Sequence, residues 1–122
     1  MTLPELSIII PTLNEAESLP LLLADLVQQR ELAFEVVVSD GGSVDSTRAI
    51  VEAFFASGQL SGNCVVGPGG RGRQLNLGVG AAKADWLLFL HADSRICDVL
   101  QLRKALDFIC EYQQQQAGLM TA

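Results

Sequence analysis

Short apolar runs alternate with segments of helical periodicity along the whole chain. Four such runs, rich in β-branched and large aliphatic residues, predict strands at residues 6–10, 34–39, 63–66 and 86–90. After each run, apolar residues recur at intervals of three and four, which predicts helices. The expected helices cover residues 19–27, a segment that opens at 43–46 and reaches 55, residues 74–83, and residues 98–114.

This β-α-β-α-β-α-β-α order predicts an α/β fold with a mostly parallel sheet and helices on both faces, a Rossmann-like nucleotide-binding arrangement. The length of 122 residues and the lack of an internal linker predict a single domain over residues 1–122. The run at 86–90 is apolar at every position, so we expect a strand buried on both faces. On the third helix, Leu75, Val79 and Ala82 are expected to face the core.

The bulk composition narrows the function classes. Hydrophobic residues make up 49% of the chain, enough for a core, and the net charge of −6 argues against a nucleic-acid-binding surface. No apolar run is long enough for a transmembrane segment, and the N-terminus does not resemble a secretory leader. Cys64, Cys97 and Cys110 lack zinc or CxxC spacing, so we expect small buried hydrophobes in a reducing compartment. The protein is therefore expected to be cytoplasmic, with peripheral membrane association as an open alternative.

Two of the predicted strands end close to an acidic residue. Asp40 follows the strand at 34–39 and precedes Gly41 and Gly42, and Asp93 follows the strand at 86–90. Ligands of open α/β sheets bind beyond the carboxyl ends of the strands, so both carboxylates are expected at one edge of the sheet. The glycines allow a tight turn and close approach of the backbone to a ligand. A carboxylate at this edge has no structural need, which favours a role for Asp40 in binding a base or sugar.

The segment at 12–15, which follows the first strand, allows two interpretations. In one, Asn14 and Glu17 form a capping box for the next helix. In the other, Thr12 and Glu15 line the same cleft as Asp40. The residues alone favour neither interpretation.

A glycine-rich loop at residues 67–73 precedes the third helix and carries Arg71 and Arg73. Backbone amides at a helix N-terminus, two guanidinium groups and little side-chain bulk suit a phosphate group. The alternative is a flexible surface loop with solvated arginines. Two arginines in so glycine-rich a segment favour anion binding.

His91 and Asp93 are candidate ligands for a hard divalent cation. Carboxylate oxygen suits Mg²⁺ or Mn²⁺, and such a cation would bridge to phosphate oxygens. A lone histidine is more often a hydrogen-bonded residue at a strand end than a ligand, so Asp93 is the stronger candidate. His91 is the one histidine of the chain and no nucleophile pattern accompanies it, which leaves a hydrolase triad unsupported.

Taken together, these segments resemble the N-terminal half of a family 2 glycosyltransferase of the GT-A fold. The resemblance rests on four motifs in order, which are weak singly and specific as a set. They lie at residues 7–15, 36–47, 70–78 and 87–94.

The resemblance implies a nucleotide-sugar donor, a UDP-sugar in our interpretation, with an acceptor that is a lipid, a saccharide or a small molecule. It assigns the nucleoside to the loops after the first two strands, and the diphosphate and sugar to the stretch around the basic pair. It makes Asp93 the final acid of the DxD motif that holds Mg²⁺ or Mn²⁺, with His91 as a second candidate ligand. The expected nucleotide-binding residues are Thr12, Asn14, Glu15, Asp40, Gly41, Gly42, Arg71, Arg73 and Asn76.

This chain departs from the family pattern in two ways. His91 and Ser39 stand where many members have an acid, and the sequence His91-Ala92-Asp93 resembles a subgroup variant of the DxD motif. The acceptor-binding half of the family follows the DxD segment, and the chain ends at Ala122 with no candidate general base. We therefore expect residues 1–122 to be a donor-binding half that is incomplete as an enzyme. The further partner expected is a second copy in an oligomer or a missing C-terminal half.

Two other function classes stay open at this point. Gly67, Gly69 and Gly72 spell the GxGxxG pattern of dinucleotide-binding oxidoreductases, with Asp93 about twenty residues further on. That pattern usually opens the first βαβ unit, and here two βα units precede it. A non-catalytic nucleotide-binding module is the other class. Binding of UDP with Mn²⁺, compared with NADH, discriminates between these alternatives.

Overall fold

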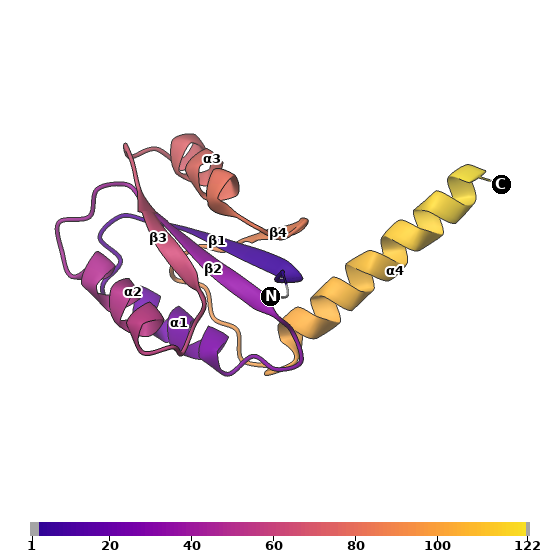
Figure 1. Cartoon of the computed structure of the whole chain (residues 1–122), viewed down its shortest axis with the longest axis horizontal. Helices are drawn as coiled ribbons and strands as arrows, with labels where there is room; N and C mark the ends of the chain where they lie inside the picture. The colour runs from indigo at the N-terminus through magenta and orange to yellow at the C-terminus, as the bar shows by residue number, and fades with distance from the viewer. Residues whose placement is uncertain (1–2, 122) are drawn as a thin grey trace.

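The computed structural model describes the backbone of residues 3–121 and the side chains of residues 3–114. Strands and helices alternate strictly along the chain, as the sequence predicts (Figure 1). The strands are β1 (Leu6–Thr12), β2 (Phe34–Asp40), β3 (Gly62–Val66) and β4 (Trp86–Phe89). The helices are α1 (Leu19–Val27), α2 (Thr47–Ala56), α3 (Arg71–Ala81) and α4 (Gln101–Thr121).

The four strands form one parallel sheet in the order β3-β2-β1-β4. Helices α1 and α2 cover one face of the sheet and α3 covers the other (Figure 1). The α/β fold class with helices on both faces is therefore confirmed. Because all strands run the same way, the segments that follow them gather at one edge, which we call the carboxyl edge.

The main hydrophobic core lies between the sheet and α1 and α2. Ile8 and Ile10 of β1 and Val36 and Val38 of β2 are completely buried there, because alternate residues of a strand share a face. The apolar stripe of α1 packs against them through Leu19, Leu22, Leu23 and Leu26, all fully buried. The helical spacing seen in the sequence thus identifies the buried side of α1.

Helix α3 approaches the other face much more closely, and its packing differs from the prediction. Its buried residues are Gln74 and Gly78, whereas Val79, expected to face the core, is 41% exposed. A Cβ atom on Gly78 would lie 2.5 Å from Cγ2 of Ile9, so only glycine lets the helix come this near to β1. The contact is made by a polar residue and a glycine, so the periodicity of apolar residues could not predict it.

Strand β4 forms one edge of the sheet, which corrects the expectation that it is buried on both faces. Leu87 is 37% and Phe89 is 48% exposed, while their neighbours Trp86 and Leu88 are half-buried against the core. An apolar run predicts burial on both faces, but it does not show that the strand lies at the edge of the sheet. Phe89 lines a depression together with Arg71 and Leu75 of α3, so α3 covers this face of β4 only in part.

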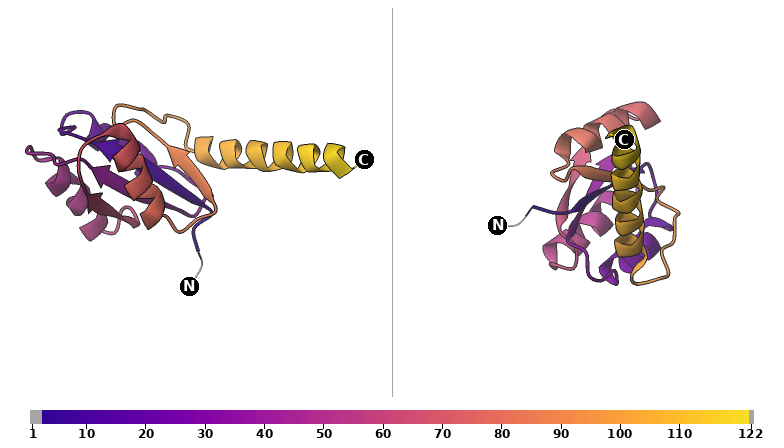
Figure 2. Two further views of the ribbon diagram at one scale, coloured as in Figure 1. Left: turned by 90° about the horizontal axis from the view of Figure 1, so that it is seen from above. Right: turned by 90° about the vertical axis from the view of Figure 1, so that its right-hand side faces the viewer.

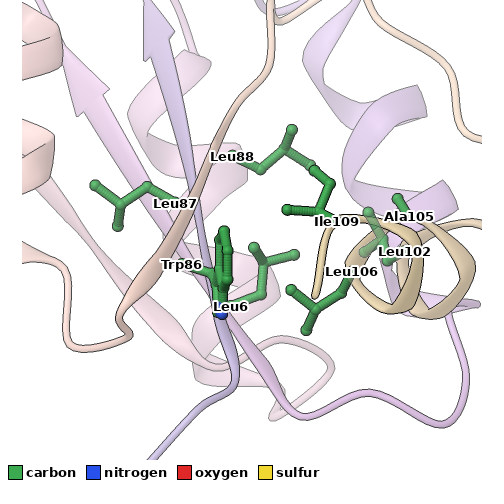
Figure 3. A pocket seen from close by; sticks show the side chains of 8 residues that line it. All are labelled: Leu6, Trp86, Leu87, Leu88, Leu102, Ala105, Leu106 and Ile109. Atoms are coloured by element: carbon green, nitrogen blue, oxygen red, sulfur yellow. The ribbon is translucent and has the colours of Figure 1, made fainter. Parts of the chain in front are cut away.

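Helix α4 begins at Gln101 rather than at residue 98, and it extends away from the sheet (Figures 1 and 2). Asp98 precedes the helix and accepts a hydrogen bond from the N–H of Leu100 at 2.9 Å. Leu102 and Leu106 in its first turns are buried. Beside them an apolar pocket opens between α4, β4 and the start of β1 (Figure 3). This pocket includes Leu6, the first residue of β1. It therefore lies near the amino-terminal ends of the strands, at the end of the sheet opposite to the carboxyl edge.

The segment between β4 and α4 is anchored to α1. Asp25 accepts hydrogen bonds from Arg95 Nε at 2.7 Å and from the N–H of Ile96 at 2.9 Å. Gln29 donates to the carbonyl of Asp98 at 2.7 Å and accepts from the N–H of Leu102 at 3.1 Å. These contacts fix the course of the chain just after the predicted metal motif.

The three cysteines differ in their exposure. Cys64 and Cys110 are partly buried, but Cys97 is exposed, so the expectation of three buried cysteines is wrong for Cys97; all three are free thiols. Within the part of the chain that the structure describes, we find no helix with the length and apolar character needed to cross a membrane.

Candidate functional site

The carboxyl ends of β1 and β2 meet at the paired residues Thr12 and Asp40. The Asp40 side chain is completely buried, and both of its oxygens accept hydrogen bonds. Oδ1 accepts from the hydroxyls of Thr12 at 2.7 Å and Ser43 at 2.6 Å. Oδ2 accepts from the backbone N–H groups of Gly42 at 3.0 Å and Ser43 at 2.7 Å. Asp40 therefore connects the end of β1 to the turn that follows β2.

This network corrects the premise that a carboxylate has no structural role at this edge. Burial raises the pKa of Asp40, but the hydrogen bonds from Ser43, Thr12 and Gly42 outweigh burial and hold that pKa below its ordinary value. The carboxylate is therefore ionised at neutral pH, and it shapes the turn as a buried anion.

Asn14 joins the loop after β1 to the loop after β2. Its φ of 54° is a left-handed conformation that asparagine tolerates better than most residues. Its side-chain Oδ1 accepts hydrogen bonds from the N–H groups of Val44 at 2.9 Å and Asp45 at 3.4 Å, and its own N–H donates to Ser43 Oγ at 2.8 Å. The capping-box interpretation with Glu17 is therefore wrong, because the Asn14 side chain faces the turn before α2 and not the start of α1.

Glu15 is held at the same place through its backbone. Its N–H donates to Thr47 Oγ1 at 2.9 Å, and its side chain is half-buried. Thr47, the buried first residue of α2, also donates through its N–H to Asp45 Oδ1 at 2.9 Å. The buried hydroxyls of Ser43 and Thr47 thus bind the two loops together.

The basic pair lies in the first turn of α3, since that helix begins three residues earlier than predicted. Both arginines belong to the helix, so the prediction that they lie in a loop is wrong. Their side chains are exposed, as expected for solvated arginines. Gly70 precedes the helix with a φ of 133°, a conformation that favours glycine. No side chain caps this helix N-terminus, which leaves its first backbone N–H groups open toward the carboxyl edge.

Gln74 is a buried residue of this site that the sequence analysis did not single out. Its Nε2 donates to the carbonyls of Thr12 at 2.9 Å and Ser39 at 3.0 Å, and its Oε1 accepts from the N–H of Gly70 at 3.1 Å. The Ser39 hydroxyl donates to the Gln74 carbonyl at 2.6 Å. An ionised acid at position 39 could not donate this bond, which gives a structural reason for serine there. The sequence offered one signal for Gln74: it is a polar residue four positions before Gly78, so both lie on the side of α3 that packs against the sheet.

His91 lies beyond β4 and contacts the basic pair. Arg71 Nη2 is 3.1 Å from Nδ1 and 2.9 Å from Nε2 of the exposed His91 ring. Together with Pro11, Leu75, Phe89 and Leu90, these two residues line a depression between α3 and the ends of β1 and β4. A ring nitrogen that accepts from a guanidinium group is not free to bind a cation, so this contact competes with the metal role considered for His91.

Asp93 is exposed, and its surroundings limit the kind of metal site it could form. Among the described residues there is no group of three or more His, Cys, Asp or Glu side chains placed to hold a cation. Mg²⁺ is commonly bound by one or two carboxylates, with phosphate and water oxygens completing its shell. The donor set therefore fits a cation shared with a bound diphosphate, and does not fit a cage built by protein side chains alone.

The structure thus brings the predicted residues into two neighbouring groups. The first is the hydrogen-bonded network around Asp40, which includes Thr12, Asn14, Gly41 and Gly42, with the N–H of Gly41 donating to Thr12 O at 2.9 Å. The second is the pair Arg71 and His91 at the start of α3. The Gln74 side chain and a 3.0 Å hydrogen bond from the N–H of Gly67 to the carbonyl of Asp40 link the two groups.

Two of the predicted binding residues, Arg73 and Asn76, stand apart from these contacts. In the described part of the chain, the side chains of Arg73 and Asn76 are exposed and make no hydrogen bond.

Arg48 of α2 is a neighbour of the site that the sequence analysis did not name. Its half-exposed side chain lies 4.0 Å from Asp40 Oδ2, and its Nη2 is 3.5 Å from the carbonyl of Ser43. Its position one residue after Thr47 could have drawn attention to it.

Open parallel α/β sheets are a class of domain that binds ligands at the carboxyl edge, and in this chain polar loops and exposed arginines gather at that edge. The sequence model described as Glycosyl transferase family 2 matches residues 7–118. The chain therefore belongs to this family. This membership disfavours the alternative of a dinucleotide-binding oxidoreductase.

Curated relatives carry glycosyltransferase names. The chain is 37% identical over 116 residues to the PGL/p-HBAD biosynthesis glycosyltransferase of Mycobacterium tuberculosis, a match that covers 93% of this chain and 44% of the relative. It is 34% identical over 113 residues to the poly(ribitol-phosphate) beta-N-acetylglucosaminyltransferase TarS of Staphylococcus aureus, covering 87% of this chain and 19% of TarS. The chain thus spans less than half the length of these relatives.

Solved structures share the fold. TarS 1–349 of S. aureus, in complex with UDP-GlcNAc, superposes with a TM-score of 0.80 at 32% identity over 89% of this chain and 32% of that one. The mannosyltransferase PcManGT of Pyrobaculum calidifontis, in complex with GDP-Man and Mn²⁺, gives a TM-score of 0.72 at 25% identity, covering 81% of this chain and 30% of that one. Both neighbours match less than half of their own chains.

Proposed function

We propose that this region binds the nucleoside diphosphate part of a nucleotide-sugar, and that the protein transfers the sugar to an acceptor hydroxyl group. The observation that carries the proposal is the joining of the 12–15 and 40–47 loops beside the open N-terminus of α3. Membership in glycosyl transferase family 2 and the similarity to a UDP-GlcNAc complex support it. We assign residues 1–122 the donor-binding role and assign none of them the role of general base.

The nucleoside is proposed to lie on the two hydrogen-bonded loops. The buried Asp40 side chain fixes the turn at Gly41 and Gly42. Backbone groups of this turn can therefore approach a base or ribose closely. Glu15, half-buried with its backbone fixed by Thr47, offers a carboxylate to the ribose hydroxyls. In this proposal Thr12 and Asn14 position these groups and do not touch the ligand.

The diphosphate is proposed to lie at the N-terminus of α3. Free backbone N–H groups and the positive end of the helix dipole attract phosphate there. Arg71, Arg73 and Asn76 project from the same helix into solvent, where they can reach phosphate or sugar oxygens. The exposed arginines supply positive charge to a chain whose net charge is −6.

Asp93 is proposed to bind Mg²⁺ or Mn²⁺ together with the diphosphate, in place of a complete DxD motif. The PcManGT complex contains Mn²⁺ with GDP-Man, which supports a metal in this family. Bound there, the cation would neutralise charge on the departing nucleoside diphosphate. We give His91 the role of an Arg71 partner, on account of their contact.

Calorimetric titration of this chain tests the proposal. We expect UDP to bind, more tightly with Mn²⁺ than with EDTA, and NADH to give no heat of binding under the same conditions. GDP titrated in parallel reports the base preference. Absence of binding by any nucleoside diphosphate, or binding of NADH alone, would overturn the proposal. Binding of a UDP-sugar without its consumption would mean that these residues act as a nucleotide-binding module by themselves.

A further inference from the structure

The Gln74 side chain forms what we call the amide clasp, defined by its hydrogen bonds to the carbonyls of Thr12 and Ser39 and to the N–H of Gly70. All three lie between 2.9 and 3.1 Å, and Gln74 is only 6% exposed. A carboxamide presents two N–H donors and one acceptor in a single plane, and the clasp uses each of them. The ends of β1 and β2 and the start of α3 are thus bound to one side chain.

Gly41 leaves the space that the clasp occupies. A Cβ atom on Gly41 would lie 2.9 Å from both Cδ and Oε1 of Gln74 and 3.0 Å from its Nε2. Gly41 has no positive φ, so its backbone would accept another residue if the amide were absent. The lack of a side chain at position 41 and the glutamine at position 74 are therefore matched to one another.

The clasp lies between the two groups of candidate ligand-binding residues. On one side is the turn that Asp40 organises, and on the other is the N-terminus of α3 with Arg71. Without the clasp, the carbonyls of Thr12 and Ser39 and the N–H of Gly70 would lose these partners, and the glycine-rich loop would lose a tie to the sheet. Loops of that composition sample many conformations unless their backbone groups are held.

We infer that Gln74 is a positioning residue of the donor site, which sets the place of the diphosphate-binding helix end relative to the nucleoside-binding turn. It acts through Gly70 and the strand ends and does not touch the ligand. This inference rests on the function proposed above. It goes beyond the resemblance to the family, which assigned no role to position 74.

The test compares UDP affinity and thermal stability in matched variants. Gln74→Ala is expected to weaken UDP binding by about tenfold or more, because displacing groups that must act together has large effects on recognition. Gln29→Ala is the control: Gln29 also joins two backbone groups, the carbonyl of Asp98 and the N–H of Leu102, away from the carboxyl edge. It is expected to lower the melting temperature and to leave UDP affinity in EDTA unchanged.

The double variant Gly41→Ala with Gln74→Ala separates positioning from packing. Gly41→Ala alone should destabilise the protein, because its methyl group would meet the amide. In the double variant the methyl group occupies vacated space, so the melting temperature should rise above that of Gly41→Ala. UDP affinity should stay as low as in Gln74→Ala, since the clasp is still missing.

Three results would overturn the inference, and they are distinguishable from one another. Wild-type UDP affinity in Gln74→Ala would remove the positioning role and leave the proposed function intact. Recovery of UDP affinity together with stability in the double variant would show that Gln74 only fills space. Failure of the unmodified chain to bind any nucleoside diphosphate would overturn the inference together with the proposed function.

Discussion

The Thr12 hydroxyl donates a 2.7 Å hydrogen bond to the buried carboxylate of Asp40, at directly paired positions of β1 and β2. The two residues are 28 positions apart in the chain. This contact brings the loop after the first strand and the loop after the second into a single surface. The remaining site residues are arranged around it.

Replacing Asp40 tests how far this surface depends on one carboxylate. Asp40→Ala removes the acceptor of four hydrogen bonds and should cost about 3–5 kcal/mol of unfolding free energy, since buried donors are left unpaired. Asp40→Asn should cost less, because an amide can still accept from the backbone N–H groups and donate to the hydroxyls. Urea denaturation measures both. Equal stability of the two variants would contradict this account, and UDP binding should weaken in the same order.

The low pKa of Asp40 predicts an acid-dependent loss of stability. Its pKa in the folded state lies below the ordinary 3.8, so the unfolded chain binds more protons in this range and stability rises with pH. The contribution of Asp40 should be complete above the ordinary pKa and should disappear as the pH falls below 3.8 toward the folded-state value. The difference in unfolding free energy between wild type and Asp40→Asn, measured against pH, should shrink over that window. A difference that is independent of pH would refute the assignment.

Asp93→Ala tests the metal proposal. We expect the increase in UDP affinity on adding Mn²⁺ to disappear, while affinity in EDTA stays near that of wild type, because Asp93 is the one exposed carboxylate assigned to the cation. Calorimetry with and without Mn²⁺ gives both quantities. His91→Ala serves as the comparison and should keep the Mn²⁺ effect. An intact Mn²⁺ dependence in Asp93→Ala would remove the assignment.

Arg71→Ala and Arg73→Ala test the diphosphate position. Each variant should weaken UDP binding by about tenfold, the loss expected for one charge-assisted contact to phosphate. Uridine carries no phosphate, so its affinity should be the same in wild type and in both variants. Titration of the two ligands at one fixed ionic strength makes the comparison. A matching loss of uridine affinity would indicate a disturbed fold and not a lost phosphate contact.

Two glycines of α3 should respond in opposite directions to alanine. Gly78→Ala should destabilise the protein despite the better helix propensity of alanine, because its methyl group would lie 2.5 Å from Cγ2 of Ile9. Nothing lies within 4 Å of a Cβ atom on Gly80, so Gly80→Ala should stabilise by up to about 1 kcal/mol. Thermal or urea unfolding measures both variants. A stabilised Gly78→Ala variant would mean that α3 can move away from β1 at little cost.

Much of the fold could be predicted because its determinants are local. The apolar stripe of α1 identified the buried side of that helix correctly, since periodicity within one element fixes which residues share a face. Strand β4 shows where this reasoning fails. Its run is as apolar as that of an enclosed strand, yet Leu87 and Phe89 are partly exposed because a strand cannot encode whether both of its faces will be covered.

The candidate site divides in the same way. The sequence by itself determined which segments reach the carboxyl edge, through strict alternation of strand and helix, and it determined the chemical groups those segments carry. Tertiary structure alone decided their partners: Asp40 with Thr12, Asn14 with the turn before α2, His91 with Arg71, and Gln74 with Gly70 and the two strand ends. The physical reason is that a hydrogen bond depends on distance and direction between groups far apart in the chain. Residue type and local spacing do not fix that geometry until the sheet and its helices have assembled.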